Sequence, residues 1–577
     1  MWSKICVVLA LASQAFAVIP QPVSISTGNS TLWVNKDIAI TYNGKAIDHN
    51  GKGNENDITE IGIVQGGAQR AMDAILKKGL VPWKLMPRGA LDTYEPSPDV
   101  RAFIKQLSIT TTGATFKNKT ANSNSSASTA DEAYKLTVSA DGTASLSAAS
   151  TSGVLYGLQS FVQLFYKHSD DRSGSYTKLA PVSISDEPKL VYRGVNLDVA
   201  RSWYEVDDIL RTIEGLAQNK LNHLHLHVTD SQSWPLEIPA LPELAQKGAY
   251  APGLSYSPRD IERIQKFALR RGVRLNVEID MPGHTTAIAL AYPDLIAAAF
   301  AKPWGSYCAE PPCGTLQLNN PEVDTFIDKL FNDLMPRLAK YSDIFHTGGD
   351  EVNANSYTLD PTTKSSDPAV IGKGIQKLVD RTHAHVRKAG MIPMVWEEML
   401  FDWNITLGKD VIIGAWHEGY AAKAVAQGYR AIAGSSDYWY LDCGHGGWIN
   451  YPNEHAAGAF PFNDYCSPVK NWRKVYYYDP WAGIPAEQQH LLYGAEVHMW
   501  SEQTDGFSVD DMLWPRTSAA AEVMWSGRHD AKGQPRDQFD VVGRLAEIRE
   551  RMLLHNFQMG PVQMPHCTQH DASECSY

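Results

Sequence analysis

Two adjacent carboxylates, Asp350 and Glu351, end the stretch Ile344–Glu351. The stretch begins as an apolar run with the character of a strand. It then passes through Gly348 and Gly349, which allow a backbone or a ligand to come close to the strand end. Two anions in a shared site repel each other, so that one pKa is raised. Such a pair can supply a proton-donating acid with a charged neighbour. The alternative is a strand that runs into a helix, with Asp350 as its N-cap.

The elements that carry this pair alternate between strands and helices from residue 191 to residue 577. The segments with the character of strands are Arg193–Val199, His223–Val228, Val273–Asp280, Ile344–Gly349, Pro393–Met399, Val411–Trp416, Arg430–Ser435 and Ala495–Trp500. The helices expected between them include Glu205–Lys220, Pro258–Arg271, Pro321–Leu338 and Gly372–Lys388. This alternation favours a (β/α)8 TIM barrel. A doubly wound open sheet is the alternative, although no glycine-rich phosphate loop follows the first strand.

Polar side chains cluster where these strands end, which is where a (β/α)8 barrel places its active site. The first strand also carries Arg193. The residues at or after the strand ends are Asp198, Arg201, His227, Asp230, Glu278, Asp280, His284, Asp350, Glu351, Trp396, Glu397, Glu398, Trp416, His417, Glu418, Tyr440, Asp442, Trp500 and Glu502. Tryptophan faces pack against the C–H surface of a sugar, while carboxylates hydrogen-bond its hydroxyl groups. The rim therefore suits a neutral, hydroxyl-rich ring.

Glycoside hydrolysis commonly uses two carboxyl groups that flank the scissile bond. Neighbouring side chains at a strand end diverge, so Asp350 and Glu351 do not easily reach opposite faces of one sugar. The pair therefore favours an acid with a helper over an acid with a nucleophile. In that arrangement an acetamido group of the substrate acts as the nucleophile, and the helper orients it.

The first 190 residues divide into three parts. Residues 1–17 have the features of a secretory signal, with Lys4, an apolar run and the small-residue site Ala15-Phe16-Ala17. Residues 18–100 are expected to be an irregular pro-segment and linker with one helical run, cut at Arg88 or Arg101. Residues 101–190 are expected to form a small α+β domain, with strands at 103–110, 134–138 and 143–148 and a helix at 152–166.

Composition and cysteine usage indicate a soluble, secreted protein. Apolar residues make up 44% of the chain and charged residues 20%, which is typical of a globular protein. The net charge of −12 argues against nucleic acid and anionic membrane surfaces as partners. Cys6 leaves with the signal, and the other cysteines form sequence-local couples that we expect to be disulfides: 308–313, 443–466 and 567–575. Glycosylation sequons at Asn29, Asn118, Asn124 and Asn404 fit the same route.

Other functions remain open at this point. His223, His225 and His227 alternate on one strand and share a face, which would also suit a zinc-dependent barrel amidohydrolase. A non-catalytic glycan-binding protein is a second alternative, and the intact Asp350-Glu351 pair argues against it. A chitinase of another barrel family is a third, but its usual run of spaced aspartates before the acid is missing.

Several motifs together resemble family 20 glycoside hydrolases, the β-N-acetylhexosaminidases, and the signal, the pro-segment-like region and the cysteine layout resemble the secreted fungal type of this family. The motifs are His346-Thr347-Gly348-Gly349-Asp350-Glu351, Val191-Tyr192-Arg193-Gly194, Leu226-His227-Val228-Thr229-Asp230, Asp280-Met281-Pro282-Gly283-His284, Val395-Trp396-Glu397, Ala415-Trp416, Tyr440-Leu441-Asp442 and Trp500-Ser501-Glu502. Residues 153–164 also resemble the helix of the small domain that precedes the barrel in this family.

The resemblance implies a role for each residue. Glu351 is the general acid and then the base for water, and its pKa is expected to stay high in an anionic or apolar setting. Asp350 accepts the acetamide N–H, and Tyr440 donates to the acetamide oxygen. Asp230 and His284 form a relay to Glu351. The ring hydroxyls are bound by Arg193, Asp442 and Glu502. The acetamide methyl and the sugar ring are enclosed by Trp396, Trp416 and Trp500.

The resemblance also implies an exo-acting, retaining enzyme that removes terminal β-linked N-acetylglucosamine or N-acetylgalactosamine from chitin oligomers and glycans. No cofactor or metal is expected. A homodimer is expected, with the chain's own cleaved pro-segment as a further binding partner.

Overall fold

The computed structural model describes residues 18–51, 54, 56–99, 101–112, 128–403, 405–450, 462–570 and 572–576. The expected signal at 1–17 and the sequons at Asn118, Asn124 and Asn404 lie outside these residues. Within the described part of the chain, no helix combines the length and the apolar character needed to cross a membrane.

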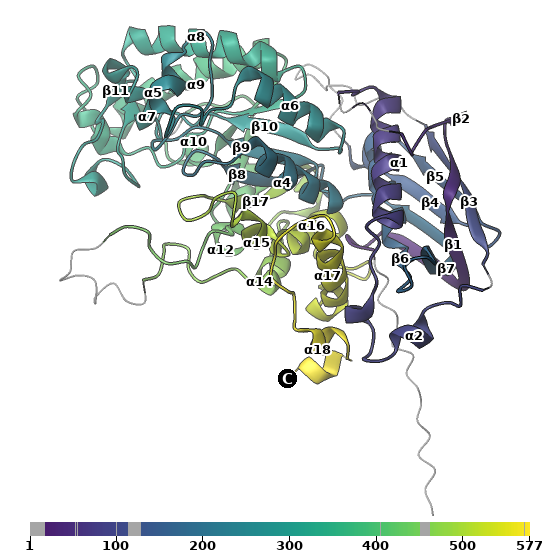
Figure 1. The fold of residues 1–577 in the computed structure, drawn as a ribbon. Helices are drawn as coiled ribbons and strands as arrows, with labels where there is room; N and C mark the ends of the chain where they lie inside the picture. Colours follow the sequence, from purple (N-terminus) through teal and green to yellow (C-terminus); the bar gives the residue numbers. More distant parts are fainter. Residues whose placement is uncertain are drawn as a thin grey trace, which may run out of the picture.

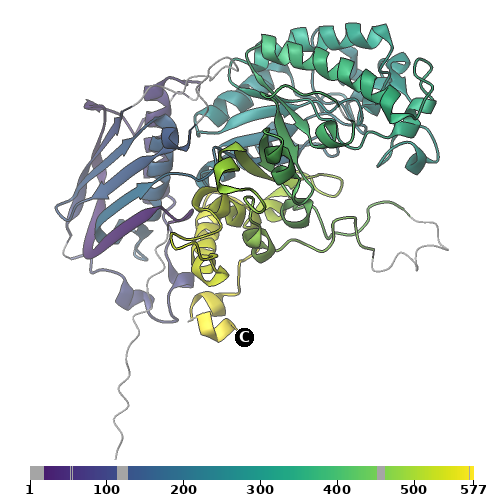
Figure 2. The ribbon, with the colours of Figure 1, turned by 180° about the vertical axis from the view of Figure 1, so that it is seen from behind.

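The N-terminal domain is a seven-stranded sheet, and its long helix α1 lies between the sheet and the barrel (Figures 1 and 2). The strands follow the order β2-β1-β3-β5-β4-β7-β6, and β1 also pairs with β7. Their bounds are β1 Ser24–Tyr42, β2 Lys45–Ala46, β3 Phe103–Thr111, β4 Tyr134–Val138, β5 Thr143–Ala148, β6 Tyr166–Lys167 and β7 Ser175–Asp186. The helices are α1 Glu60–Leu76, α2 Leu91–Tyr94 and α3 Thr151–Gln163, with short 3-10 turns η1 Trp83–Leu85 and η2 Thr129–Glu132.

The expectation that residues 18–100 are irregular is wrong. Strand β1 is a long strand within the sheet, where it pairs in parallel with β3 and antiparallel with β7. Helix α1 packs against α3 and buries Val64, Ala68 and Met72 in the same core. The serine- and threonine-rich sequence of β1 hides this strand, because backbone pairing with two neighbours places it more than any apolar pattern does.

The second domain is a closed barrel in the strand order β10-β13-β14-β15-β16-β17-β8-β9, and all the pairs between its strands are parallel. This confirms the predicted (β/α)8 barrel and the expected place of each strand. The strands are β8 Tyr192–Asp198, β9 His223–His227, β10 Arg274–Glu278, β13 Ile344–His346, β14 Ile392–Trp396, β15 Ile412–Ala415, β16 Arg430–Ala433 and β17 Leu492–Met499.

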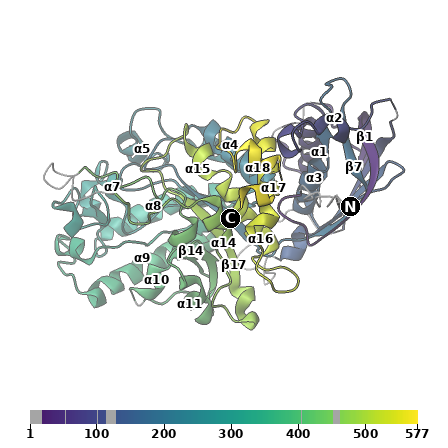
Figure 3. The same cartoon turned by 90° about the horizontal axis from the view of Figure 1, so that it is seen from below.

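Helices surround the barrel, and the C-terminal ones turn toward the N-terminal domain (Figure 3). The helices are α4 Val206–Gln218, α5 Glu243–Gly248, α6 Pro258–Leu269, α7 Thr286–Ala289, α8 Pro321–Leu338, α9 Pro368–Lys388, α10 Glu398–Phe401, α11 Tyr420–Ala426, α12 Ser436–Trp439, α14 Trp472–Tyr477, α15 Val509–Leu513, α16 Arg516–Ser526, α17 Gln538–Leu553 and α18 Pro565–Thr568. A two-stranded sheet, β11 Ile296–Ala297 with β12 Thr315–Leu316, lies in the loop after α7.

Three crossover helices start with the same local sequence. A polar residue caps the helix and a proline follows it, as in Ser257-Pro258, Asn320-Pro321 and Asp367-Pro368. The side chain of each cap accepts a hydrogen bond from a backbone N–H of the first turn, and the fixed φ of proline suits the first helical position. These signals set where each helix leaves its loop, and therefore how each strand end faces the rim.

Buried charges join the two domains. Nζ of Lys220 lies 3.0 Å from Oδ2 of Asp186, and the hydroxyl of Tyr134 donates to the same oxygen over 2.6 Å. The indole N–H of Trp525 donates to the other oxygen of Asp186 over 3.0 Å. The guanidinium of Arg193 lies over the Trp525 ring, 5.0 Å from its centroid. Since buried charges are costly unless they are paired, these contacts fix the two domains in one arrangement.

The three expected disulfides are confirmed: Cys308–Cys313, Cys443–Cys466 and Cys567–Cys575.

Candidate active site

The Gly348-Gly349 turn carries the acidic pair past the end of β13. Gly348 has a φ of +71°, and a Cβ at this position would lie 1.7 Å from Oδ1 of Asp280. The same oxygen accepts a hydrogen bond of 2.7 Å from the backbone N–H of Gly349, whose φ is +112°. Both glycines are needed, because a side chain would be strained by the backbone and blocked by Asp280 or Met399.

The acidic pair sits at the mouth of the barrel and does not cap a helix. The next short helical turn is capped by Asn353, so the helix-cap interpretation of Asp350 is wrong. The side chain of Asp350 is 14% exposed and that of Glu351 is 37% exposed. Glu351 has a φ of +52°, which is unusual for a residue with a side chain, and His284 has a φ of +51°. Both residues hold strained backbones where they meet, as functional residues often do.

A chain of hydrogen bonds and ion-pair contacts connects Glu351 to the interior of the barrel. Nε2 of His284 lies 3.3 Å from Oε2 of Glu351, and Nδ1 of His284 lies 3.1 Å from Oδ1 of Asp230. The other oxygen of Asp230 lies 2.7 Å from Nε2 of His227. Nδ1 of His227 lies 2.5 Å from Oε2 of Glu278, which is fully buried in β10. The predicted pair of Asp230 and His284 is therefore part of a longer chain.

The charges along this chain are unevenly distributed. Burial alone would lower the pKa of His284, but the carboxylates of Asp230 and Asp350 raise this pKa well above its usual value. Burial would raise the pKa of Glu351, yet its hydrogen bond to His284 and the charge of that ring hold the pKa below its usual value. The expectation of a high pKa for Glu351 is therefore wrong for the free site, because His284 is cationic.

The proton held by the carboxyl groups lies deeper, on Asp280. Burial and the charge of Asp350 raise the pKa of Asp280 well above its usual value. Burial also raises the pKa of Asp350, which His284 and a hydrogen bond to Asp280 oppose. A neutral Asp280 can donate to Asp350, and Asp350 then stays ionised and able to accept a further hydrogen bond.

The expected aromatic side chains come together. Trp396, Tyr440 and Trp500 form one buried cluster, and Trp416 packs against it. The Trp500 ring centroid lies 6.4 Å from that of Trp396 and 6.2 Å from that of Tyr440, while Trp416 stacks on Tyr440 at 6.2 Å. The indole N–H of Trp396 donates to Glu278 over 2.8 Å, so this ring forms the floor of the site.

Two further carboxyl groups lie close to the cluster in the sequence, because Asp442 follows Tyr440 and Glu502 follows Trp500. Burial raises the pKa of Asp442 to about 7. Burial also raises the pKa of Glu502 well above its usual value, against the charge of Arg201. Such groups are able to donate as well as accept hydrogen bonds near neutral pH.

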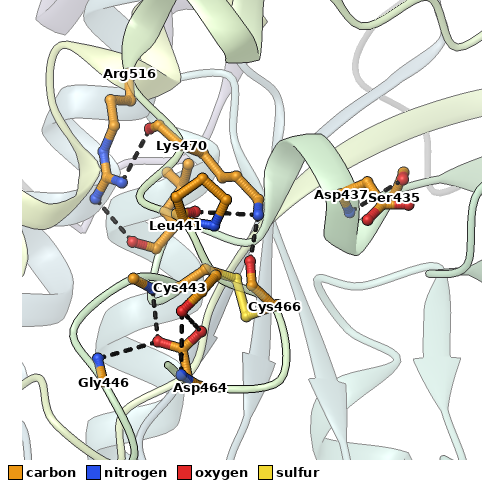
Figure 4. Close-up of a disulfide and its surroundings, with 12 residues drawn as sticks. Ser435, Asp437, Leu441, Cys443, Gly446, Asp464, Cys466, Lys470 and Arg516 are labelled. Carbon is orange, nitrogen blue, oxygen red and sulfur yellow. Dashed lines mark hydrogen bonds between the residues drawn. A yellow bond between two sulfur atoms is a disulfide. The ribbon is translucent and has the colours of Figure 1, made fainter. Parts of the chain in front are cut away.

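A disulfide supports the loop that carries Tyr440 and Asp442 (Figure 4). Cys443 is bonded to Cys466, and Asp464 accepts hydrogen bonds from the backbone N–H groups of Gly444, over 2.6 Å, and Gly446, over 3.2 Å. The guanidinium of Arg516 donates to the carbonyl of Leu441 over 2.8 Å. The loop is therefore fixed on both sides of Asp442.

Arg193 does not belong to the site, and its predicted role in binding hydroxyl groups is wrong. It lies at the start of β8, at the end of the barrel opposite Glu351, and it is 0% exposed. Its guanidinium donates to the carbonyls of Lys220, over 3.0 Å, and Leu190, over 2.7 Å, and pairs with Glu132 at 2.7 Å.

Arg201 is the arginine at the rim. It lies beyond the C-terminal end of β8, 3.0 Å from Oδ2 of Asp230 and 2.5 Å from Oε1 of Glu310. Its guanidinium is 5.2 Å from the centroid of the Trp500 ring. Its position after the strand end is the signal that separates it from Arg193. Glu310, in the loop closed by Cys308–Cys313, carries no comparable signal in the sequence.

The histidines of β9 do not converge as the zinc alternative requires. His223 stacks on Tyr192 at 4.1 Å, with Nδ1 2.7 Å from Asn222. His225 lies between Glu278 and Glu496, at 3.0 and 3.3 Å. Among the described residues, the ligand atoms of His225, Glu278 and His346 lie within 4.8 Å of one another and are able to approach a metal ion. The partners of His225 already account for its burial, because both are carboxylates.

A parallel barrel with carboxylates and tryptophans at the strand ends defines a class of barrel glycosidase. The catalytic domain of glycosyl hydrolase family 20 matches residues 190–528, and the family domain described as beta-acetyl hexosaminidase like matches residues 18–164. The chain therefore belongs to glycosyl hydrolase family 20, as the motifs predicted. The second match also assigns residues 18–100 to the N-terminal domain.

The chain is similar to relatives from fungi and insects. It is 38% identical to a beta-hexosaminidase of Arthroderma benhamiae over 98% of both chains. It is 34% identical to a chitooligosaccharidolytic beta-N-acetylglucosaminidase of Ostrinia furnacalis, over 76% of this chain and 74% of the relative. Among solved structures, an exo beta-N-acetylglucosaminidase of Vibrio harveyi with N-acetylglucosamine bound has the same fold, with a TM-score of 0.71, 22% identity, and coverage of 95% and 79%.

Replacement of Gly348 tests the turn. We expect Gly348→Ala to abolish turnover of a chromogenic N-acetylglucosaminide, because the new Cβ displaces Asp280 from the N–H of Gly349. Gly44→Ala is the matched control, since Gly44 has a similar φ of +78° with open space around it. The control pays only the backbone cost, about 1 kcal/mol of folding free energy. Equal activity of the two variants would contradict the proposed packing.

The charge on His284 predicts how the activity depends on pH. Removing the carboxylate in Asp230→Asn lowers the pKa of His284, because that carboxylate raises it in the wild type. The His284–Glu351 pair then loses its last proton at lower pH. We expect the alkaline limb of the kcat/KM profile to move down by about 1 to 2 pH units.

Asp294→Asn, at an exposed aspartate, makes the same change in net charge away from the site and should leave the profile unchanged. An alkaline limb that stays in place in Asp230→Asn would show that Asp230 does not control this proton.

Proposed function

We propose that this protein is an exo-acting, retaining β-N-acetylhexosaminidase that removes terminal β-linked N-acetylglucosamine or N-acetylgalactosamine. The proposal rests above all on Asp350 and Glu351, which approach the same nitrogen, Nε2 of His284, at 3.9 and 3.3 Å. Both carboxyl groups therefore lie on one side of the site. An acid beside a helper suits catalysis in which the substrate's own acetamido group is the nucleophile.

In the first step, Glu351 protonates the glycosidic oxygen while the acetamide carbonyl oxygen attacks the anomeric carbon. The free site keeps Glu351 ionised against His284, and a bound sugar removes water from this exposed carboxyl group. Desolvation favours the neutral acid, so the proton moves onto Glu351 when the substrate covers it. In the second step, Glu351 takes a proton from the water that opens the oxazolinium-like ring.

Asp350 accepts the acetamide N–H, which aims the carbonyl oxygen and stabilises the positive charge of the intermediate. Its hydrogen bond to Asp280 supports this role, because a neutral Asp280 leaves the charge on Asp350. Tyr440 donates to the acetamide oxygen, and the cluster with Trp396, Trp416 and Trp500 encloses the methyl group and the sugar ring. In this scheme Arg201 replaces Arg193 as the arginine that binds ring hydroxyls, together with Asp442 and Glu502.

Chitin oligomers are the proposed natural substrate. The name of the Ostrinia furnacalis relative and the fungal origin of the Arthroderma benhamiae relative support this choice. The disulfides support an exported protein, and we propose that the chain is secreted through the signal at 1–17. A homodimer stays a prediction of the family resemblance.

Substitution of each carboxylate tests the proposed roles. We expect Glu351→Gln to lower kcat on a chromogenic N-acetylglucosaminide by about 10²- to 10⁴-fold, since an amide is too weak an acid to protonate the glycosidic oxygen. Asp350→Asn should also lose turnover, because it no longer orients the acetamido group. Glu187→Gln changes an exposed carboxylate of the N-terminal domain, just after β7, and should keep wild-type rates.

Wild-type turnover in Glu351→Gln would exclude Glu351 as the acid. Wild-type turnover in Asp350→Asn would exclude Asp350 as the helper. Parallel assays on the galactosaminide establish the preference between the two sugars. Binding of either sugar without turnover by the wild type would identify a glycan-binding protein instead.

We also propose that any processing of residues 18–100 occurs at Arg88 and leaves the N-terminal piece bound. Arg88 is exposed, whereas Arg101 donates to the carbonyl of Ser173 over 2.9 Å and lies over the Trp33 ring. The piece retains β1 in the sheet and the ion pair of Lys84 with Glu550 at 2.8 Å.

N-terminal sequencing of the purified, undenatured protein tests this proposal. We expect two sequences, one from near residue 18 and one from residue 89. A single new sequence from residue 102 would contradict it.

A further inference from the structure

A second concave site lies between the two domains, away from the barrel mouth. A cavity of about 70 Å³ is bounded by α1 and α3 of the N-terminal domain and by α4, Arg271 and His555 of the barrel domain. Figure 1 shows α1 on the side of the N-terminal domain that faces the barrel. Helix α4 ends just before β9 and Arg271 just before β10, so the cavity is at the N-terminal ends of the strands, opposite Glu351.

Basic side chains dominate the wall of this cavity. The basic residues are Arg70, Lys78, Arg271, Arg551 and His555, and the one carboxylate among the lining residues is that of Glu214. The rest of the wall is apolar or neutral, from residues such as Leu155, Leu158 and Val162. Low-dielectric walls strengthen the field of an unbalanced charge inside such a space.

Two of the basic side chains are already paired with a carboxylate of the protein. Nε of Arg271 is hydrogen-bonded to Glu214. Arg551 pairs with Glu547 at 2.7 Å and also donates to the carbonyls of Gln163 and Phe165. These two guanidinium groups are therefore balanced within the protein.

Arg70, Lys78 and His555 have no such direct ion pair. Within the described part of the chain, none of the three lies within ion-pair distance of a carboxylate, and the guanidinium of Arg70 donates to the neutral carbonyl of Arg270 over 2.7 Å. Burial and the charges of Arg271 and Arg270 lower the pKa of Arg70 to about 9, and the charge of Glu214 offsets this lowering only in part. Burial and the charge of Lys78 also lower the pKa of His555.

We propose that this cavity binds a small oxyanion, a phosphate or sulfate group, through Arg70 and Lys78. Charge-assisted hydrogen bonds to such an anion supply the missing negative charge, and a guanidinium matches two of its oxygens. Because Arg70 and Lys78 belong to the N-terminal domain and His555 of the barrel domain lines the same cavity, the bound anion lies between the two domains. Binding therefore raises the thermal stability of the whole chain.

Titration of the full chain with inorganic phosphate by isothermal calorimetry tests the site, at an ionic strength held constant with sodium chloride. We expect a saturable isotherm, and sulfate should compete with phosphate. Arg70→Met and Lys78→Met should each weaken binding about tenfold or more, the effect of one charge-assisted hydrogen bond. Lys77→Met is the matched control, because Lys77 carries the same charge on the adjacent residue but does not line the cavity.

The melting temperature with and without phosphate is the second readout. Lys78→Met should fold like the wild type, because Lys78 is exposed and its replacement leaves the core intact. The proposal predicts a phosphate-dependent rise in the wild type and in Lys77→Met that is reduced in the two cavity variants. Absence of saturable binding to the wild type would overturn it. Equal affinity of all three variants would also overturn it, since the anion would then bind elsewhere.

Discussion

The hydrogen bond between His284 and Glu351 is the contact on which the site depends, because it decides where the catalytic proton rests. The carboxylates of Asp230 and Asp350 raise the pKa of His284 and so favour its charged form beside Glu351. Asp230 in turn stays ionised despite its burial, since Arg201 and His284 lower its pKa. Each member of the chain is thus fixed by the charge of the next, and the last member, Glu278, lies inside the barrel.

The fold supplies the geometry that this series of hydrogen-bonded side chains, from Glu351 to Glu278, requires. Parallel strands bring the ends of β9, β10 and β13 to neighbouring positions, so that His227, Glu278 and His346 lie side by side in the register. Left-handed backbone at His284 and Glu351 turns the two side chains toward each other. The buried charges of Lys220 and Asp186 hold the N-terminal sheet against the opposite end of the barrel, away from the substrate.

Much of this arrangement follows from the sequence. Short apolar runs and the Ser257-Pro258 type of helix start indicate the barrel, and sequence-local cysteines indicate the disulfides. Strand β1 could not be predicted in the same way, because its partners β3 and β7 are remote in sequence. Arg193 and Arg201 differ only in which end of β8 they occupy, which a motif does not state. The pKa of Glu351 depends on a proton shared among side chains from several loops, which spacing along the chain does not show.

The stereochemistry of the first product tests the central claim most directly, because attack by the acetamido oxygen followed by water inverts the anomeric carbon twice, whereas direct attack by water inverts it once. Proton NMR of a β-N-acetylglucosaminide, recorded within the first turnovers and before mutarotation, shows which anomer is released. Attack by the acetamido oxygen followed by water predicts the β-anomer. Release of the α-anomer would mean that water attacks directly, and the roles given to Asp350 and Glu351 would be contradicted.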